Sequence, residues 1–174
     1  MSRLEKPPTE AMIRRRLSRS TLIRSAGARA HQAHFVCLVV DHGPSDEPGL
    51  AQAIEVEGLE VVTAASAHEA LRILAERRVD IVVAEECLPC IPGSRLLETI
   101  HHDWPRVGRV LVGRDLGPDI IIQAVNRARV QRVLPRRTPA VTLRVEVEAA
   151  LNETLLARSD SELRDSASRR SARV

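Results

Sequence analysis

Acidic and basic side chains stand at the ends of several short apolar runs in this sequence. Asp41 follows the run 35–40, Glu85 follows the run 79–84, and Arg136 comes shortly after the run 130–134. A fourth run, 107–112, ends at Gly113, which offers no side chain. In sheets of parallel strands the functional site lies at the carboxyl ends of the strands. We therefore expect these positions to meet at one edge, where Glu85 and Arg136 could form an ion pair.

A second group with possible chemistry is Cys87-Leu-Pro-Cys90, in the segment after the third apolar run. A C-x-x-C can be redox-active or provide half of a zinc site. Zinc would need two further ligands, for which His42 with Asp41 or Glu86 are the candidates. The alternative is that the spacing is incidental. Cys37 lies inside the first run, where we expect it to pack as a small apolar residue.

The elements that would position these groups alternate between two periodicities. Five β-branched runs, at 35–40, 59–63, 79–84, 107–112 and 130–134, are separated by segments with helical spacing. Ser66-Ala-His-Glu69 is a capping-box pattern, and Gly117-Pro118-Asp119 places proline at a helix start. A last helical segment runs from about Pro139 to Ala157. Strands alternating with helices predict an α/β fold, a doubly wound five-stranded parallel sheet with five helices.

Composition and charge divide the 174-residue chain into three parts. Residues 1–34 form a basic arm, possibly partly helical, with eight Lys or Arg against two Glu. The domain covers 35–157, and we expect 158–174 to be a disordered polar tail. The arm could contact nucleic acid or an anionic membrane, or simply be a solvated, flexible terminus. Its arginines include Arg14, Arg15, Arg16, Arg19 and Arg24.

The three cysteines, an odd number, argue against a disulfide framework and for a reducing compartment. The apolar runs are far too short to cross a bilayer, and the N-terminus has no apolar stretch typical of a secretory signal. We therefore expect a cytoplasmic protein.

Several segments in order resemble the receiver domain of bacterial response regulators, the CheY-like family. They are Val39-Val-Asp-His-Gly-Pro44, Glu57-Gly-Leu-Glu-Val-Val-Thr-Ala64, Ser66-Ala-His-Glu-Ala-Leu71, Asp80-Ile-Val-Val-Ala-Glu85, Leu88-Pro89 with Gly93, and Ala124–Leu134. The resemblance covers about residues 35–157. It implies a flavodoxin-like fold and a site that takes a phosphoryl group from a histidine kinase onto an aspartate, with Mg²⁺ held by acidic groups.

The positions that carry this chemistry in the family are altered here. Asp41 keeps the first acidic position, but His42 replaces the second, and Glu85 stands where the family has the phosphoacceptor aspartate. Gly113 replaces the hydroxyl residue, and Arg136 replaces the lysine. Val133 occupies the position of the switch aromatic. Phosphorylation in the family manner is therefore not expected. Glu85 is either a decayed position or imitates the phosphorylated state by extending negative charge towards Arg136.

These departures predict a stand-alone pseudo-receiver, a non-enzymatic protein-interaction module in bacterial signalling or cell organisation that needs no cofactor, metal or small-molecule substrate. The family commonly uses the face of the fourth helix, fifth strand and fifth helix for partners or for homodimers. Carried onto this sequence, that face would expose Gln123, Arg127, Arg129, Gln131, Arg132 and Val133. The alternatives are a phosphoryl-accepting single-domain regulator, association with nucleic acid or membrane through the basic arm, and a redox or zinc switch at Cys87 and Cys90.

Overall fold

The structure, a computed structural model, describes residues 35–43 and 49–171, with side chains described up to residue 164. The predicted basic arm, with Arg14, Arg15, Arg16, Arg19 and Arg24, therefore lies outside the described residues. Within them, no helix is long and apolar enough to cross a membrane.

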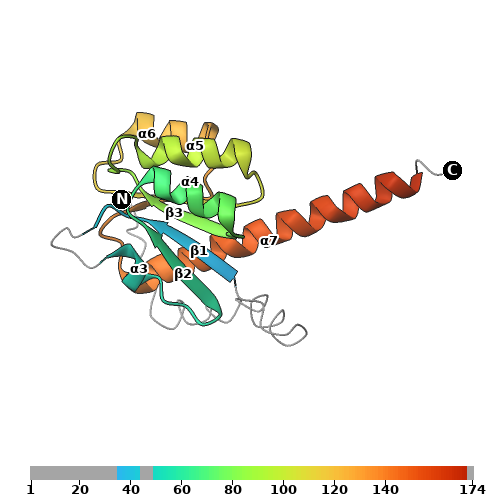
Figure 1. The fold of residues 1–174 in the computed structure, drawn as a ribbon, viewed down its shortest axis with the longest axis horizontal. Coiled ribbons are helices and arrows are strands. Elements are labelled where there is room, and N and C mark those ends of the chain that lie inside the picture. Colours follow the sequence, from blue (N-terminus) through green and yellow to red (C-terminus); the bar gives the residue numbers. More distant parts are fainter. Residues whose placement is uncertain (1–34, 44–48, 172–174) are drawn as a thin grey trace, which may run out of the picture. The chain divides into compact units, whose positions relative to one another are not determined.

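Five parallel strands form one sheet in the order β2-β1-β3-β4-β5 (Figure 1). Their bounds are β1 Phe35–Val40, β2 Leu59–Ala64, β3 Ile81–Glu85, β4 Gly108–Gly113 and β5 Arg132–Pro135. Every residue of β1, β3 and β4 is buried, whereas the edge strands β2 and β5 are only partly so. Near-continuous apolar runs form the inner strands because both of their faces are covered. The predicted doubly wound sheet is confirmed.

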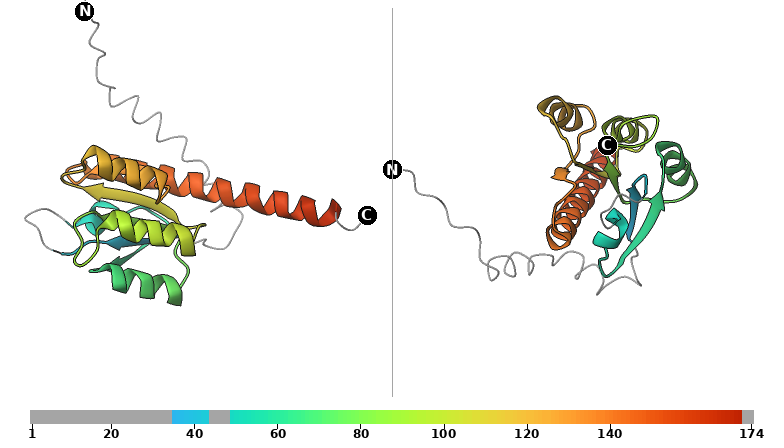
Figure 2. Two further views of the ribbon diagram at one scale, coloured as in Figure 1. Left: turned by 90° about the horizontal axis from the view of Figure 1, so that it is seen from above. Right: turned by 90° about the vertical axis from the view of Figure 1, so that its left-hand side faces the viewer.

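Helices cover both faces of the sheet. Their bounds are α3 Leu50–Ala53, α4 Ala67–Glu76, α5 Gly93–Asp103, α6 Pro118–Asn126 and α7 Ala140–Ser171. Helices α4, α5 and α6 lie on one face, and α3 and α7 lie on the other (Figure 2). The strand order reverses between β1 and β3, which puts the switch point at the carboxyl ends of these two strands.

The signals that start two helices act as the sequence predicts. Ser66 accepts a hydrogen bond from the backbone N–H of Glu69, and the Glu69 carboxylate accepts one from the N–H of Ala65. Pro118 stands in the first turn of α6, after Gly117. The first N–H groups of a helix have no acceptor inside the helix. The capping box supplies acceptors at the start of α4, and Pro118 has no N–H that would need one.

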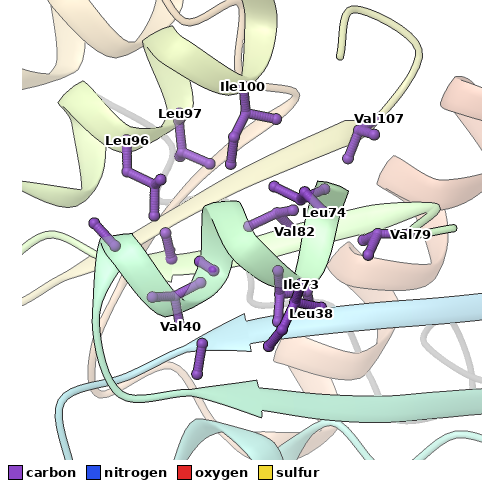
Figure 3. Close-up of a cluster of buried hydrophobic side chains, with 14 of the residues drawn as sticks. Leu38, Val40, Ile73, Leu74, Val79, Val82, Leu96, Leu97, Ile100 and Val107 are labelled. Atoms are coloured by element: carbon purple, nitrogen blue, oxygen red, sulfur yellow. The ribbon is translucent and has the colours of Figure 1, made fainter. Parts of the chain in front are cut away.

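One layer of the aliphatic core lies between the sheet and helices α4 and α5. Leu38, Val40 and Val82 of the sheet face Ile73 and Leu74 of α4 (Figure 3). Leu96, Leu97 and Ile100 of α5 complete this layer, and all three are fully buried. Because the inner strands are fixed from both sides, their carboxyl ends are fixed as well, and the site is built on those ends.

The C-terminal boundary differs from the prediction. Residues 158–171, expected to belong to a disordered tail, continue helix α7, which extends past the end of the sheet (Figure 1). Polar composition suggested disorder, but no Gly or Pro interrupts 140–171. In addition, Arg158 anchors the helix, because it donates to the carboxylate of Asp80 at 2.7 Å and to the carbonyl oxygen of Arg106 at 2.7 Å.

Asp80 is the buried end of this anchor, with 1% of its surface exposed. Its carboxylate also accepts hydrogen bonds from the backbone N–H of Val36 and from Arg78. Burial by itself would raise the pKa of Asp80, but the hydrogen bonds from Arg158 and Val36 outweigh it and hold that pKa below its usual value. The Asp80 carboxylate thus links β1, the start of β3 and α7 at the amino ends of the strands, away from their carboxyl ends.

We predict that Asp80→Asn lowers the free energy of unfolding by about 3 kcal/mol, because it leaves a half-buried guanidinium without its counter-charge. Urea unfolding followed by circular dichroism measures this loss. The control is Glu76→Gln, which breaks the exposed Arg72–Glu76 pair and should cost less than about 0.5 kcal/mol. Equal effects of the two substitutions would show that Asp80 does not anchor α7.

Candidate functional site

Three charged side chains meet at the carboxyl ends of the strands, as the sequence predicts. Asp41 follows β1, Glu85 is the last residue of β3, and Arg136 follows β5. The guanidinium of Arg136 is 4% exposed, and the two carboxyl groups are 13% and 11% exposed. The cluster is therefore almost closed to water, and its charges act on one another at short range.

Arg136 contacts both carboxyl groups. Its Nη2 donates to Asp41 Oδ2 at 3.2 Å, and its Nε lies 3.3 Å from Glu85 Oε1 without hydrogen-bond geometry. The backbone N–H of Arg136 donates to the carbonyl oxygen of Gly113 at 2.7 Å, which fixes the point from which the side chain crosses the edge. A side chain from an edge strand thus reaches the two central strands.

The two carboxyl groups also act on each other. Burial, and then the interaction with the Asp41 carboxyl group and its charge, raise the pKa of Glu85. For Asp41, burial acts upwards, but the interactions with Glu85 and with the Leu50 N–H, together with Arg136, hold its pKa below the usual range. Of the two groups, Glu85 is therefore the one that holds a proton more readily, and Asp41 the one that ionises more readily.

Two further positions were predicted at this site, His42 and Gly113. His42 is exposed, directly after Asp41. Gly113 is buried, and a Cβ atom there would lie 2.5 Å from Leu116 Cδ2 and 3.1 Å from Glu86 Cβ. The position where the family has a hydroxyl group is thus closed over by Leu116. Sequence reasoning missed this contact, since nothing in the sequence signals that Leu116 folds back onto the strand end.

The arrangement does not fit Mg²⁺. This ion takes oxygen ligands and keeps several bound waters, whereas Asp41 Oδ2 accepts from Arg136 and from the Leu50 N–H. Asp41 Oδ1 is buried, so it is not exposed to a hydrated ion. The nearest positive group is a guanidinium, which would repel the ion. What the cluster can do chemically is hold a proton and fix three strand ends.

The predicted partner face also differs in detail. Gln123, Arg127 and Arg129 are exposed on and after α6. Val133 is half-buried and packs against the core. Gln131 and Arg132 are half-buried and engaged within the domain: Gln131 accepts from the Arg109 N–H, and Arg132 pairs with Glu146 and Glu153 of α7. These two residues hold α7 against β5, so they are less exposed than the sequence suggested.

Apolar residues stand on this face in place of the expected polar ones. The exposed fractions of Ile121, Ile122 and Val125 of α6 are 38%, 56% and 47%, and that of Val141 of α7 is 58%. In α6 only Ala124 is buried. Sequence reasoning used the α6 residues only to identify the helix. The available signal was the spacing of Ile121 and Ile122, which lie four and three residues before Val125. This spacing puts all three side chains on one side of the helix.

The C-x-x-C does not join a metal site in the described part of the chain. Cys87 and Cys90 are free and exposed, and no group of three or more His, Cys, Asp or Glu among the described residues could hold a metal ion. The predicted zinc alternative, with His42 and Asp41 or Glu86, therefore finds no ligand set here. Cys37 is fully buried, as predicted, and burial raises its pKa to about 12.

Comparisons with known proteins agree with this fold. The family model described as "Response regulator receiver domain" matches residues 37–148. The hydrogenase transcriptional regulatory protein HoxA of Cupriavidus necator is 29% identical over 74% of this chain, which covers 27% of HoxA. The heme response regulator HssR of Staphylococcus aureus is 32% identical over 45% of this chain, which covers 35% of HssR. The chain thus spans about a third or less of these relatives.

Solved structures give the same picture. The signal receiver domain of an HD domain-containing protein from Pseudomonas fluorescens is 26% identical, with a TM-score of 0.70, and the match covers 76% of this chain and 98% of that one. NtrX from Brucella abortus, solved in complex with ATP, is 25% identical with a TM-score of 0.66, over 75% of this chain and 30% of that one.

The raised pKa of Glu85 predicts how stability depends on pH. Because the folded pKa of Glu85 is raised, protonated Glu85 contributes stability that is present below its unfolded pKa of about 4.3 and is lost as pH rises through the folded value. Glu85→Gln keeps a neutral side chain at every pH. We predict that its free energy of unfolding, relative to the unsubstituted protein, rises as the pH increases above about 4.3, as measured by urea unfolding.

Asp41→Asn is the matched background for this measurement, because it removes the carboxylate that raises the pKa of Glu85. In that background the pH dependence of the Glu85→Gln effect should shrink. The same dependence in both backgrounds would show that Asp41 does not raise the pKa of Glu85.

Proposed function

Because this chain belongs to the response regulator receiver domain family, we propose that it is a pseudo-receiver, a signalling module that binds other proteins without being phosphorylated. The observation that carries the proposal is the buried cluster of Asp41, Glu85 and Arg136, in which Arg136 contacts both carboxyl groups. The cluster occupies the strand ends with internal contacts, so that neither an acceptor carboxylate nor a cation site is left open.

The cluster supports a constitutive state in preference to imitation of phosphate. A phosphoryl group brings additional negative charge, whereas burial and the neighbouring Asp41 raise the pKa of Glu85 and so disfavour a negative charge at that position. Arg136 already binds the carboxylate of Asp41. Such a pair fixes one conformation of the strand ends through geometry, and no ligand is needed to select it.

The surface offered to partners is the α6–β5–α7 face, defined by Ile121, Ile122, Val125 and Val141 together with Gln123, Arg127 and Arg129. Apolar side chains surrounded by arginines are typical of the centre and rim of protein interfaces. The buried guanidinium of Arg109 keeps this face in place, because it donates to the carbonyl oxygens of Ala128 and Arg129 at the end of α6. The partner can be another signalling protein or a second copy of the chain.

The chemistry is tested by incubating the purified chain with acetyl phosphate and Mg²⁺ and measuring its intact mass. We expect no phosphoryl adduct on the unsubstituted chain. We also expect none on Glu85→Asp, because Arg136, His42 and Gly113 remain. An adduct on the unsubstituted chain would refute the proposal. An adduct on Glu85→Asp alone would assign the loss of chemistry to the length of residue 85 rather than to Arg136.

The partner face is tested with Ile122→Glu. Since Ile122 is 56% exposed, its replacement should change the free energy of unfolding by less than about 1 kcal/mol. It should weaken partner binding about tenfold or more if the face is an interface. The measurement is affinity capture with quantitative mass spectrometry, with sedimentation velocity for self-association.

The matched control for this test is Leu163→Glu, at an exposed apolar position of α7 outside the face. The control should leave capture and self-association unchanged. Equal binding by all three proteins would exclude the face.

A further inference from the structure

The segment between β3 and α5, residues 86–92, is a loop closed at its base by one residue. The backbone carbonyl of Glu86 accepts from the N–H of Gly93 at 2.9 Å, and its carboxylate accepts from the N–H and the hydroxyl of Ser94 at 2.8 and 2.9 Å. The N–H of Glu86 donates to Val112 of β4 at 2.8 Å. A Cβ atom at Gly93 would lie 2.1 Å from the Glu85 carbonyl oxygen, so this tight closure requires glycine.

Both exposed cysteines lie at the centres of γ-turns in this loop. The N–H of Leu88 donates to the carbonyl oxygen of Glu86 at 3.0 Å, across Cys87. The N–H of Ile91 donates to the carbonyl oxygen of Pro89 at 2.9 Å, across Cys90, whose φ is +71°. A γ-turn with positive φ is rare and strained for a residue with a side chain. Strained backbone of this kind concentrates at functional positions.

The two thiols differ from the third cysteine in their access to solvent. Cys87 and Cys90 are exposed on a loop, whereas Cys37 is fully buried in β1 with its pKa raised to about 12. Thiolate formation and access decide which cysteines react. The packing of the domain does not require either exposed thiol, because neither belongs to the buried core.

We propose that Cys87 and Cys90 form a reversible dithiol–disulfide pair, oxidised by low-molecular-weight disulfides such as oxidised glutathione. One thiolate attacks a sulfur of the oxidant, releases one glutathione thiol and forms a mixed disulfide. The second thiolate then attacks the protein sulfur of that mixed disulfide and releases the second glutathione. The protein loses two electrons and two protons, and the oxidant becomes two thiols.

The loop geometry favours a bond within the chain. A disulfide joins Cα atoms about 4.4–6.8 Å apart, whereas three residues of extended chain span about 10 Å. A segment that carries two γ-turns and is closed between Glu86 and Gly93 is folded back rather than extended. The bond would constrain the loop whose base is Glu86, and Glu86 holds both the first turn of α5 and the end of β4.

The test uses the purified full chain, treated with oxidised glutathione under native conditions, alkylated and digested with trypsin. Cleavage after Arg78 and Arg95 releases residues 79–95, which contain both cysteines of the pair and not Cys37. We expect this peptide to lose two hydrogens, and reduced glutathione to restore both thiols. Cys37 should be alkylated only after unfolding.

The single variants Cys87→Ser and Cys90→Ser provide the matched controls, and each should carry one glutathione adduct on this peptide. A peptide that stays reduced, that carries two adducts in the unsubstituted protein or that joins two chains would overturn the proposal. Hydrogen exchange then tests the link to Glu86. In the unsubstituted protein, the protection of the Gly93 and Ser94 amides should change on oxidation. In the double variant that carries both Cys87→Ser and Cys90→Ser, it should not change. Unchanged exchange in both the unsubstituted protein and the double variant would refute that link.

Discussion

The contacts of the Arg136 guanidinium with two carboxyl groups determine what the site at the strand ends can bind. Arg136 enters from the edge of the sheet, is almost completely buried and reaches the carboxyl groups of Asp41 and Glu85. A buried guanidinium requires a counter-charge, and two adjacent carboxylates disfavour each other's ionisation in a site with little access to water. The carboxylate of Asp41 supplies the counter-charge, and the raised pKa of Glu85 limits a second negative charge. The closed site, the poor fit for Mg²⁺ and the proposed independence from phosphorylation all follow from this arrangement.

The same domain places its other surfaces around that fixed site. The three buried inner strands β1, β3 and β4 position the site at their carboxyl ends. At the other end of the sheet, the contact between Asp80 and Arg158 anchors the long helix α7. Beside the site, Glu86 closes the loop that carries Cys87 and Cys90. On the α6–β5–α7 face, the apolar side chains of Ile121, Ile122 and Val125 remain exposed on α6. The loop with the proposed thiol chemistry and the face with the proposed binding therefore belong to the same domain.

Much of this could be predicted from the sequence, because strand patterns and parallel topology are local and regular. The apolar runs located all five strands, and the rule for strand ends brought Asp41, Glu85 and Arg136 together. Other features depend on contacts that no local pattern encodes. Leu116 folds over Gly113, Arg158 reaches Asp80 across 78 positions, and a polar segment continues as helix. The raised pKa of Glu85 depends on burial and on the nearness of Asp41, which only the assembled structure shows.

The most direct test of the account is a Mg²⁺ titration of the isotope-labelled chain followed by backbone amide NMR. If Arg136 occupies the strand ends through its contacts with Asp41 and Glu85, the amides of Asp41, Glu85 and Arg136 will show no saturable shift at millimolar Mg²⁺. Saturable shifts centred on these three residues would show that the cluster opens to admit the ion. That result would contradict a site closed by its own side chains.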